Sequence, residues 1–64
     1  MKNRIHEKRK QLKLSQKTLA QRCQVSRQTI NAIENNKYDP TLLLAFRLAR
    51  ELGTTVDDLF QQDQ

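Results

Sequence analysis

Amide and guanidinium side chains between residues 27 and 35 are placed to form hydrogen bonds rather than to catalyse a reaction. At about 100° per residue, a helix that turns Ile30 and Ile33 inward presents a polar face outward. That face consists of Arg27, Gln28, Asn31, Ala32 and Asn35. Gln and Asn can form two hydrogen bonds with adenine, Arg can bond guanine, and the Ala methyl group can contact that of thymine. An ordinary solvated helix more often carries Glu and Lys there, so this face predicts readout of DNA bases.

The remaining reactive side chains do not form a catalytic or metal centre. The sequence has one His, His6, and one Cys, Cys23, so neither an internal disulfide nor a cysteine metal site is expected. It has no glycine-rich loop, and 64 residues leave little bulk to enclose a substrate pocket. The sequence therefore predicts a protein that is not an enzyme and that needs no cofactor, metal or small-molecule ligand. We expect His6 on the surface and Cys23 in the core.

The net charge of +5 is unevenly distributed along the chain. Residues 1–37 contain ten basic and two acidic side chains, a formal charge of +8, whereas residues 38–64 contain two basic and five acidic ones, a charge of −3. This division predicts one end that faces a polyanion and another that faces away from it. A merely solvated charged surface is the alternative. Membrane binding is not expected, because the basic half lacks a bulky apolar face with Trp or Phe for insertion into lipid.

Apolar runs in the sequence are short. The longest, Leu42–Phe46, falls far below the ~20 residues that a membrane-spanning helix needs. No apolar stretch of signal-peptide length follows the basic start of the chain. These two observations point to the cytoplasm.

The pattern of polar and apolar residues predicts short helices throughout and no strand. An N-cap candidate precedes each helix, and these candidates are Asn3, Ser15, Ser26, Thr41 and Thr55. We expect Ile5 and Leu12 on the buried face of the first helix and Gly53 at the end of the fourth. Residues 61–64 are expected to fray. The fold class is therefore all-α, a compact five-helix domain that occupies residues 1–64.

The segment Ser15–Lys37 contains two of these helices, joined by a tight turn. The small side chain of Ala20 allows the two helices to approach closely, and Val25 fills the corner between them. Two isoleucines anchor the second helix from its inner side. Such an arrangement is a helix-turn-helix motif, here about residues 15–35, which offers its second helix to the major groove of DNA.

A series of residues, in order along the chain, is similar to one family of regulators. The series comprises Arg9, Leu12, Leu14, Ser15, Gln16, Leu19, Ala20, Val25–Ile30, Ile33, Glu34, Lys37–Leu42, Ala49, Leu52, Gly53, Leu59 and Phe60. From about Arg4 to Phe60 the chain resembles the Cro/repressor-type (Xre) helix-turn-helix transcriptional regulators. It is most similar to the short, stand-alone members that have no effector domain. The resemblance implies a repressor-like five-helix fold and binding to DNA.

The resemblance also assigns roles to individual residues. Base reading would be carried out by Arg27, Gln28, Asn31 and Ala32. Contacts to DNA phosphates would come from Gln16, Ser26, Thr29, Asn35, Lys37 and Arg9. Gln16 would also brace the second helix of the motif, which is the recognition helix that enters the groove. Glu34 is expected to form a structural ion pair with a basic residue of the first or second helix. Gln24 and Asn36 stand where the family usually has Gly, so both are expected to have a positive φ, which would strain Gln24 by about 1 kcal/mol.

Apolar residues of the C-terminal half predict a homodimer. On a helical wheel anchored at Leu42, Phe46 joins the core face, and Leu43 and Leu44 fall on the outer face without a partner. The interface is expected to include Leu43, Val56, Leu59 and Phe60, because exposed apolar patches on small domains usually mark interfaces. Single exposed leucines without a function are the alternative. Two-fold pairing would read half-sites about 34 Å apart on a palindromic operator.

The sequence thus predicts a sequence-specific regulator of transcription that binds double-stranded DNA, a repressor that acts as a homodimer. One alternative is the antitoxin of a toxin–antitoxin pair, which would use the same fold to sequester a partner protein. Another is a protein-interaction module without DNA binding. The polar face of residues 27–35 and the +8 charge of residues 1–37 disfavour this last possibility.

Overall fold

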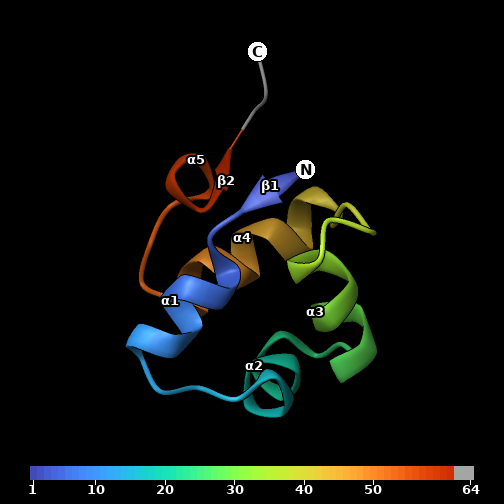
Figure 1. The fold of residues 1–64 in the computed structure, drawn as a ribbon, viewed down its shortest axis with the longest axis vertical. Coiled ribbons are helices and arrows are strands. Elements are labelled where there is room, and N and C mark those ends of the chain that lie inside the picture. The colour runs from blue at the N-terminus through green and yellow to red at the C-terminus, as the bar shows by residue number, and fades with distance from the viewer. Residues whose placement is uncertain (62–64) are drawn as a thin grey trace.

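A computed structural model describes residues 1–61 of the chain. Within that part, five helices surround a small core and two very short strands lie at one end (Figure 1). The helices are α1 (Ile5–Gln11), α2 (Gln16–Cys23), α3 (Arg27–Glu34), α4 (Leu42–Glu51) and α5 (Val56–Leu59). The strands are β1 (Lys2–Asn3) and β2 (Phe60–Gln61). The predicted all-α fold with five helices is confirmed.

The strand pair was not expected from the sequence. β1 and β2 pair in antiparallel fashion, with Lys2 opposite Gln61 and Asn3 opposite Phe60. Strands of two residues are too short to show an alternating pattern, so periodicity cannot reveal them. Residue 61 is therefore paired rather than frayed, and the rest of that expectation, residues 62–64, lies outside the described residues.

Hydroxyl side chains cap four of the helices at their first turn, as predicted. Each accepts a hydrogen bond from the backbone N–H three residues later: Ser15 from Thr18 (3.0 Å), Ser26 from Thr29 (3.1 Å), Thr41 from Leu44 (3.2 Å) and Thr55 from Asp58 (3.1 Å). For α1 the residue at the N-cap is Arg4, whose side chain makes no cap bond. The capping acceptor of α1 is instead the preceding residue, Asn3, whose Oδ1 accepts a hydrogen bond from the backbone N–H of Ile5 at 3.1 Å.

The ends of α1 to α4 share one geometry, in which a residue with positive φ reverses the chain. These residues are Lys13 (58°), Gln24 (60°), Asn36 (61°) and Gly53 (67°). The residue after each one donates its N–H to a carbonyl five residues back, for example Val25 to Ala20 at 3.0 Å and Lys37 to Ala32 at 2.9 Å. This is the Schellman pattern of helix termination. The positive φ expected at Gln24 and Asn36 is confirmed, whereas that of Lys13 was not predicted.

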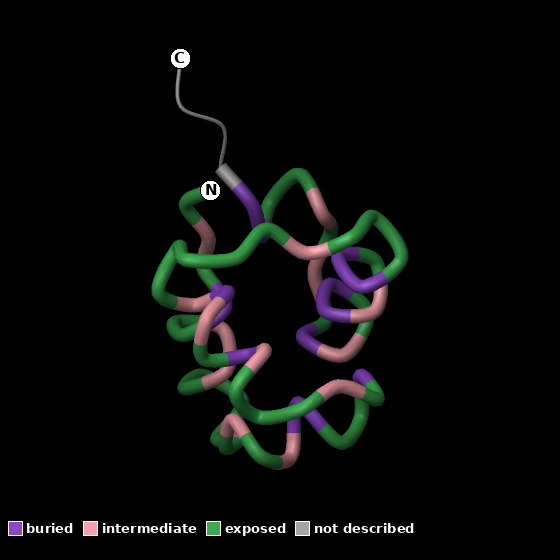
Figure 2. Tube along the Cα trace, turned by 90° about the vertical axis from the view of Figure 1, so that its right-hand side faces the viewer, coloured by how far each residue is buried: buried purple, intermediate pink, exposed green. Residues whose placement is uncertain are grey.

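The core lies between the helices, and the buried residues line the inner side of the chain (Figure 2). It is formed by Ile5, Leu19, Ala20, Cys23, Ile30, Ile33, Leu44, Ala45, Leu48, Ala49, Leu52, Leu59 and Phe60. Cys23 is buried as expected, and burial raises the pKa of its thiol. His6 is exposed, also as expected.

Four apolar side chains of α1 and α4 do not lie where the sequence placed them. Leu12 is exposed, because α1 ends at Gln11 and Leu12 already belongs to the turn. In α4 the buried stripe is displaced from the predicted one: Leu44 is 8% exposed, whereas Leu42 is 69% exposed. Phe46 lies on the exposed side together with Leu42. Because the run Leu42–Phe46 is apolar throughout, the sequence does not show which of its side chains face the core.

Leu59 and Phe60 are buried in the core, so the expectation that they form part of an exposed apolar patch is wrong. The chain leaves α5 directly into β2, and the N–H of Arg4 donates to the carbonyl of Leu59 at 2.8 Å. Both side chains belong to the core cluster, and Phe60 lies opposite Asn3 in the pairing of β2 with β1. Of the four predicted interface residues, Leu43 is exposed and Val56 is partly buried.

Polar contacts attach α5 to α1. Asp58 accepts a hydrogen bond from the hydroxyl of Thr54 at 2.9 Å, and its carboxylate lies 3.6 Å from Lys8 Nζ and 3.9 Å from an Arg4 guanidinium nitrogen. The Thr54 hydrogen bond, and then the charge of Lys8, lower the pKa of Asp58 below its usual value. These contacts hold the short α5 against α1. No helix within residues 1–61 is long and apolar enough to cross a membrane.

Candidate nucleic-acid interface

The predicted helix-turn-helix is formed by α2, α3 and the three residues between them. Gln24 ends α2 in the left-handed conformation, and Ser26 begins α3 as its cap. Val25, between them, is partly buried against the core and fixes the corner. Residues 15–35 therefore form two short helices joined by a tight turn, with α3 at the edge of the molecule (Figure 1).

The two sides of α3 are chemically distinct. Ile30 and Ile33 are fully buried and attach the helix to the core. The predicted outward face is exposed at Arg27, Gln28, Asn31 and Asn35, and Ala32 is partly exposed. Three of the base-reading candidates, Arg27, Gln28 and Asn31, line one open hollow of about 440 Å³ together with Ser26. The structure thus brings the predicted readers together on one surface that the core does not use.

Four of the predicted phosphate contacts surround this face. Gln16 begins α2 and its Oε1 lies 3.5 Å from Asn31 Nδ2, so it stands beside the recognition helix. The hydroxyls of Ser26 and Thr29 lie 2.9 Å apart at the start of α3. Lys37 follows α3 directly and its side chain is exposed. Ser26 and Thr29 thus lie at the start of α3 and Lys37 just beyond its end, while Gln16 stands beside its middle, so the four residues flank the exposed face of the helix.

Arg9 does not fit its predicted role as a phosphate contact. Its Nε donates to Glu34 Oε2 at 3.1 Å, and its two terminal nitrogens donate to the Leu14 carbonyl at 2.9 Å and to Glu34 Oε1 at 3.2 Å. The Arg9 side chain is 13% exposed and that of Glu34 is 5% exposed. The guanidinium is therefore engaged inside the protein. The expected structural ion pair of Glu34 with a basic residue of the first or second helix is confirmed, and Arg9 is its partner.

The side chain of Asn35 also disagrees with a phosphate contact. Its Nδ2 donates to the backbone carbonyl of Asn31 at 2.9 Å and to the side-chain Oδ1 of Asn31 at 3.0 Å. Both N–H groups of the Asn35 amide are therefore used within α3. Only its amide oxygen remains to face DNA, and an oxygen cannot donate a hydrogen bond to phosphate. Asn35 therefore acts within the recognition helix.

Sequence reasoning missed a role of Asn3. Its Nδ2 donates to the Ile33 carbonyl at 2.9 Å and lies 3.3 Å from Asn36 Oδ1. With its Oδ1 bonded to the N–H of Ile5, this one side chain connects β1, the start of α1 and the end of α3. An Asn that caps a helix shows no local signal for a contact 30 residues away. Asn3 and Arg9 together hold the end of the recognition helix in place.

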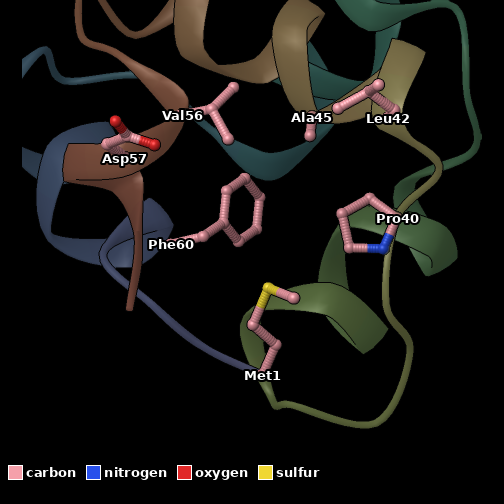
Figure 3. A pocket seen from close by; sticks show the side chains of 7 residues that line it. All are labelled: Met1, Pro40, Leu42, Ala45, Val56, Asp57 and Phe60. Carbon is pink, nitrogen blue, oxygen red and sulfur yellow. The ribbon is translucent and has the colours of Figure 1, made fainter. Parts of the chain in front are cut away.

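A second exposed surface lies on α4, and it is apolar. Leu42, Leu43 and Phe46 are exposed there. Beside them is a hollow of about 780 Å³ (Figure 3), lined by Met1, Pro40, Leu42, Ala45, Val56, Asp57 and Phe60. In Figure 3 apolar side chains from α4, α5 and the two ends of the described chain surround the opening. This surface contains none of the predicted base readers.

Comparison with known proteins agrees with this geometry. A family model described as helix-turn-helix matches residues 5–59, which is most of the chain. The chain belongs to the Cro/repressor-type helix-turn-helix family. A relative in this family, from Methanothermobacter thermautotrophicus, is 48% identical over 65 residues and is named an uncharacterized HTH-type transcriptional regulator. The match covers 100% of this chain and 94% of that relative.

Solved structures of the helix-turn-helix family share the fold. The DNA-binding domain of the P22 C2 repressor is 29% identical, with a TM-score of 0.82, over 94% of this chain and 86% of that domain. Hydroxypropylphosphonic acid epoxidase from S. wedmorenis is also 29% identical, with a TM-score of 0.80 over 89% of this chain. That likeness covers only 30% of the epoxidase, so the shared fold corresponds to a minor part of that enzyme.

Proposed function

We propose that the protein is a sequence-specific regulator of transcription that binds double-stranded DNA and represses by occupying an operator. The observation that carries this proposal is the exposed side of α3. Arg27, Gln28 and Asn31 line one open hollow there, while Ile30 and Ile33 attach the opposite side of the helix to the core. Those three side chains have the donors and acceptors that read guanine and adenine in the major groove.

Charge and relatives support the same function. The +8 charge of residues 1–37, which include α2 and α3, favours contact with a polyanion. The relatives described above are named as a regulator and a repressor domain, and the antitoxin alternative gains no support from them. The proposed activity requires no reaction, cofactor or small-molecule ligand. We place this activity in the cytoplasm, where such a regulator would meet DNA.

We expect Gln28→Ala to weaken binding to the operator by about 1–3 kcal/mol, because one bidentate base contact is lost. The operator is first obtained by selecting bound sequences from a random DNA pool. Binding of the variant is then measured on that operator and on variants of each base pair. Discrimination should fall at one position, and affinity for unrelated DNA should stay the same. Normal operator binding by Gln28→Ala would show that Gln28 does not read a base as proposed.

Lys37→Ala is expected to weaken binding to all DNA sequences alike. The Lys37 ammonium would neutralise one phosphate, and the counterion that it releases contributes about one unit to the slope of log affinity against log salt concentration. The slope of the protein should be several units, and that of the variant about one unit less. A flat response of the unsubstituted protein to salt would contradict DNA binding itself.

The apolar surface of α4 supports pairing of two copies. Leu43 is 62% exposed in the monomer, and it lies next to Leu42 and Phe46. A contiguous exposed apolar area of this kind marks an interaction site on a small domain. The charge of −3 on residues 38–64 keeps this end from phosphates and leaves two α3 helices free for adjacent half-sites. We therefore propose a homodimer on a palindromic operator, with Leu43 and Val56 at the interface.

Leu43→Asp is expected to convert the dimer to a monomer and to weaken operator binding. The substitution places a carboxylate in the first turn of α4, where the helix itself tolerates acid, so the effect should be on association rather than folding. Sedimentation at micromolar concentration should give about twice the monomer mass for the unsubstituted protein. Leu12→Asp, at an exposed leucine of the α1 terminus, is the matched control. Equal masses for Leu43→Asp and the control would contradict the interface.

A further inference from the structure

Three amide side chains form a connected row along the DNA-facing side of the motif. Asn35 Nδ2 lies 2.9 Å from the backbone oxygen of Asn31 and 3.0 Å from the Asn31 side-chain oxygen. Asn31 Nδ2 in turn lies 3.5 Å from Gln16 Oε1, at the long end of the hydrogen-bond range. All three residues belong to the helix-turn-helix, and Asn31 also lines the hollow with Arg27 and Gln28. The row therefore continues into the base-reading surface.

The backbone carbonyl of Asn31 determines which way each amide points. A carbonyl oxygen only accepts hydrogen bonds, so the group of Asn35 beside it must be the NH₂ group. That NH₂ group also lies against the Asn31 side chain, which must therefore present its oxygen. The Asn31 NH₂ group is consequently on the side of Gln16, and Gln16 presents its own oxygen to it. The polarity of Asn31 thus follows from one fixed acceptor on the helix backbone.

The fixed amide of Asn31 keeps one N–H and one lone pair of Oδ1 for DNA. Adenine presents a matching pair in the major groove, the N7 acceptor and the N6 amino donor. We propose that Asn35 is a positioning residue that fixes the polarity of Asn31 for recognition of adenine, with N6 of the base toward Asn35 and N7 toward Gln16. This inference rests on the proposed function of α3 and adds a specificity-determining residue that does not itself contact a base.

The Asn35 side chain is dispensable for the fold, which makes the inference testable. The residue is exposed at the end of α3, outside the core. Its backbone N–H donates to the same Asn31 carbonyl at 3.1 Å, so that carbonyl keeps a partner when the side chain is removed. Asn35→Ala should therefore remain folded, with the far-ultraviolet circular dichroism and melting temperature of the unsubstituted protein close to unchanged.

The first experiment measures base preference in Asn31→Ala, Asn35→Ala and the double variant by selection from a random DNA pool. The position that loses its adenine preference in Asn31→Ala is the one that Asn31 reads. At that position the unsubstituted protein should favour adenine by about 5- to 150-fold. Asn35→Ala should lower this preference several-fold at that position alone, and the double variant should be no worse there than Asn31→Ala. Independent losses that multiply in the double variant would overturn the inference.

The second experiment changes the polarity directly. In Asn35→Asp the carboxylate can only accept, so Asn31 should turn its NH₂ group toward residue 35 and lose the preference for adenine at that position. Asn36→Asp is the matched control, because it adds the same charge one residue away. Residue 36 has a φ of 61°, which Asp tolerates. A carboxylate oxygen at this position can still accept the hydrogen bond from Asn3 Nδ2. The control should weaken binding to all sequences equally and keep the adenine preference.

Two results would overturn the inference, and they differ from failure of the proposed function. One is an Asn35→Ala variant with unchanged preference at the position that Asn31 reads. The other is an Asn35→Asp variant whose selected sequences match those of Asn36→Asp. Failure of the proposed function would instead appear in the unsubstituted protein, which would then select no sequence from the pool.

Discussion

Arg9→Ala is expected to lower the free energy of unfolding by about 3–5 kcal/mol, the range for breaking a buried ion pair by removal of one partner. The carboxylate of Glu34, only 5% exposed, would lose its paired hydrogen bonds from the guanidinium. A chain of this length is stable by roughly 3–10 kcal/mol in total. The variant should therefore lose a third or more of its stability and bind DNA more weakly at 37 °C, although Arg9 contacts no DNA in the proposed mode.

Denaturation by urea, followed by circular dichroism, measures this loss. Lys10→Ala removes an exposed basic side chain from the same helix and should leave the midpoint nearly unchanged. The double variant Arg9→Met with Glu34→Leu should recover most of the stability, because well-packed apolar residues can replace a buried ion pair. If Arg9→Ala unfolds at the same urea concentration as Lys10→Ala, the pair does not hold α3 in place.

Leu48→Ala should cost about 2–5 kcal/mol of stability, as large-to-small substitutions in cores do. Leu48 is fully buried in α4, a helix that packs against α2, and the substitution would leave a cavity in the core. Leu12→Ala is the matched control, because Leu12 is an exposed leucine at the end of α1. It should change stability by no more than about 0.5 kcal/mol.

Thermal and urea unfolding of the two leucine variants test the core directly. The difference between them should appear as a lower melting temperature for Leu48→Ala, and its DNA binding should return when the temperature is reduced. Equal midpoints would mean that α4 does not pack as the structure has it. A large loss of stability in Leu12→Ala would instead support the sequence-based assignment of this leucine to the core.

Features that depend on local chemistry were predictable from the sequence. The caps at Ser15, Ser26, Thr41 and Thr55 were predicted because an N-cap bond spans only three residues. The two faces of α3 were predicted because its pattern is unambiguous, with two isoleucines on one side and polar residues on the other.

Features that depend on competition between distant segments were not predictable. Five apolar residues in succession start α4, and only packing against the other helices decides that Leu44 is buried and Leu42 is exposed. The inward position of Phe60 requires the pairing of β2 with β1, nearly the whole chain away. For Arg9 and Asn35 the residue type allowed a phosphate contact, and only the structure shows that their donors are already bonded within the protein.

The separation of the two faces of α3 has a consequence for how such a protein diverges. The side chains that support the fold, Ile30 and Ile33, share no contact surface with Arg27 and Gln28, which line the hollow on the opposite side. If Arg27 and Gln28 read bases as proposed, substitutions there change the DNA sequence that is bound without a penalty in stability. Duplicated copies of the gene can acquire new operators at these positions one step at a time, while every intermediate remains folded. Asn31 and Asn35 differ from these two residues, because they are bonded to each other and, in the proposed mode, a change at either one alters the base that Asn31 reads.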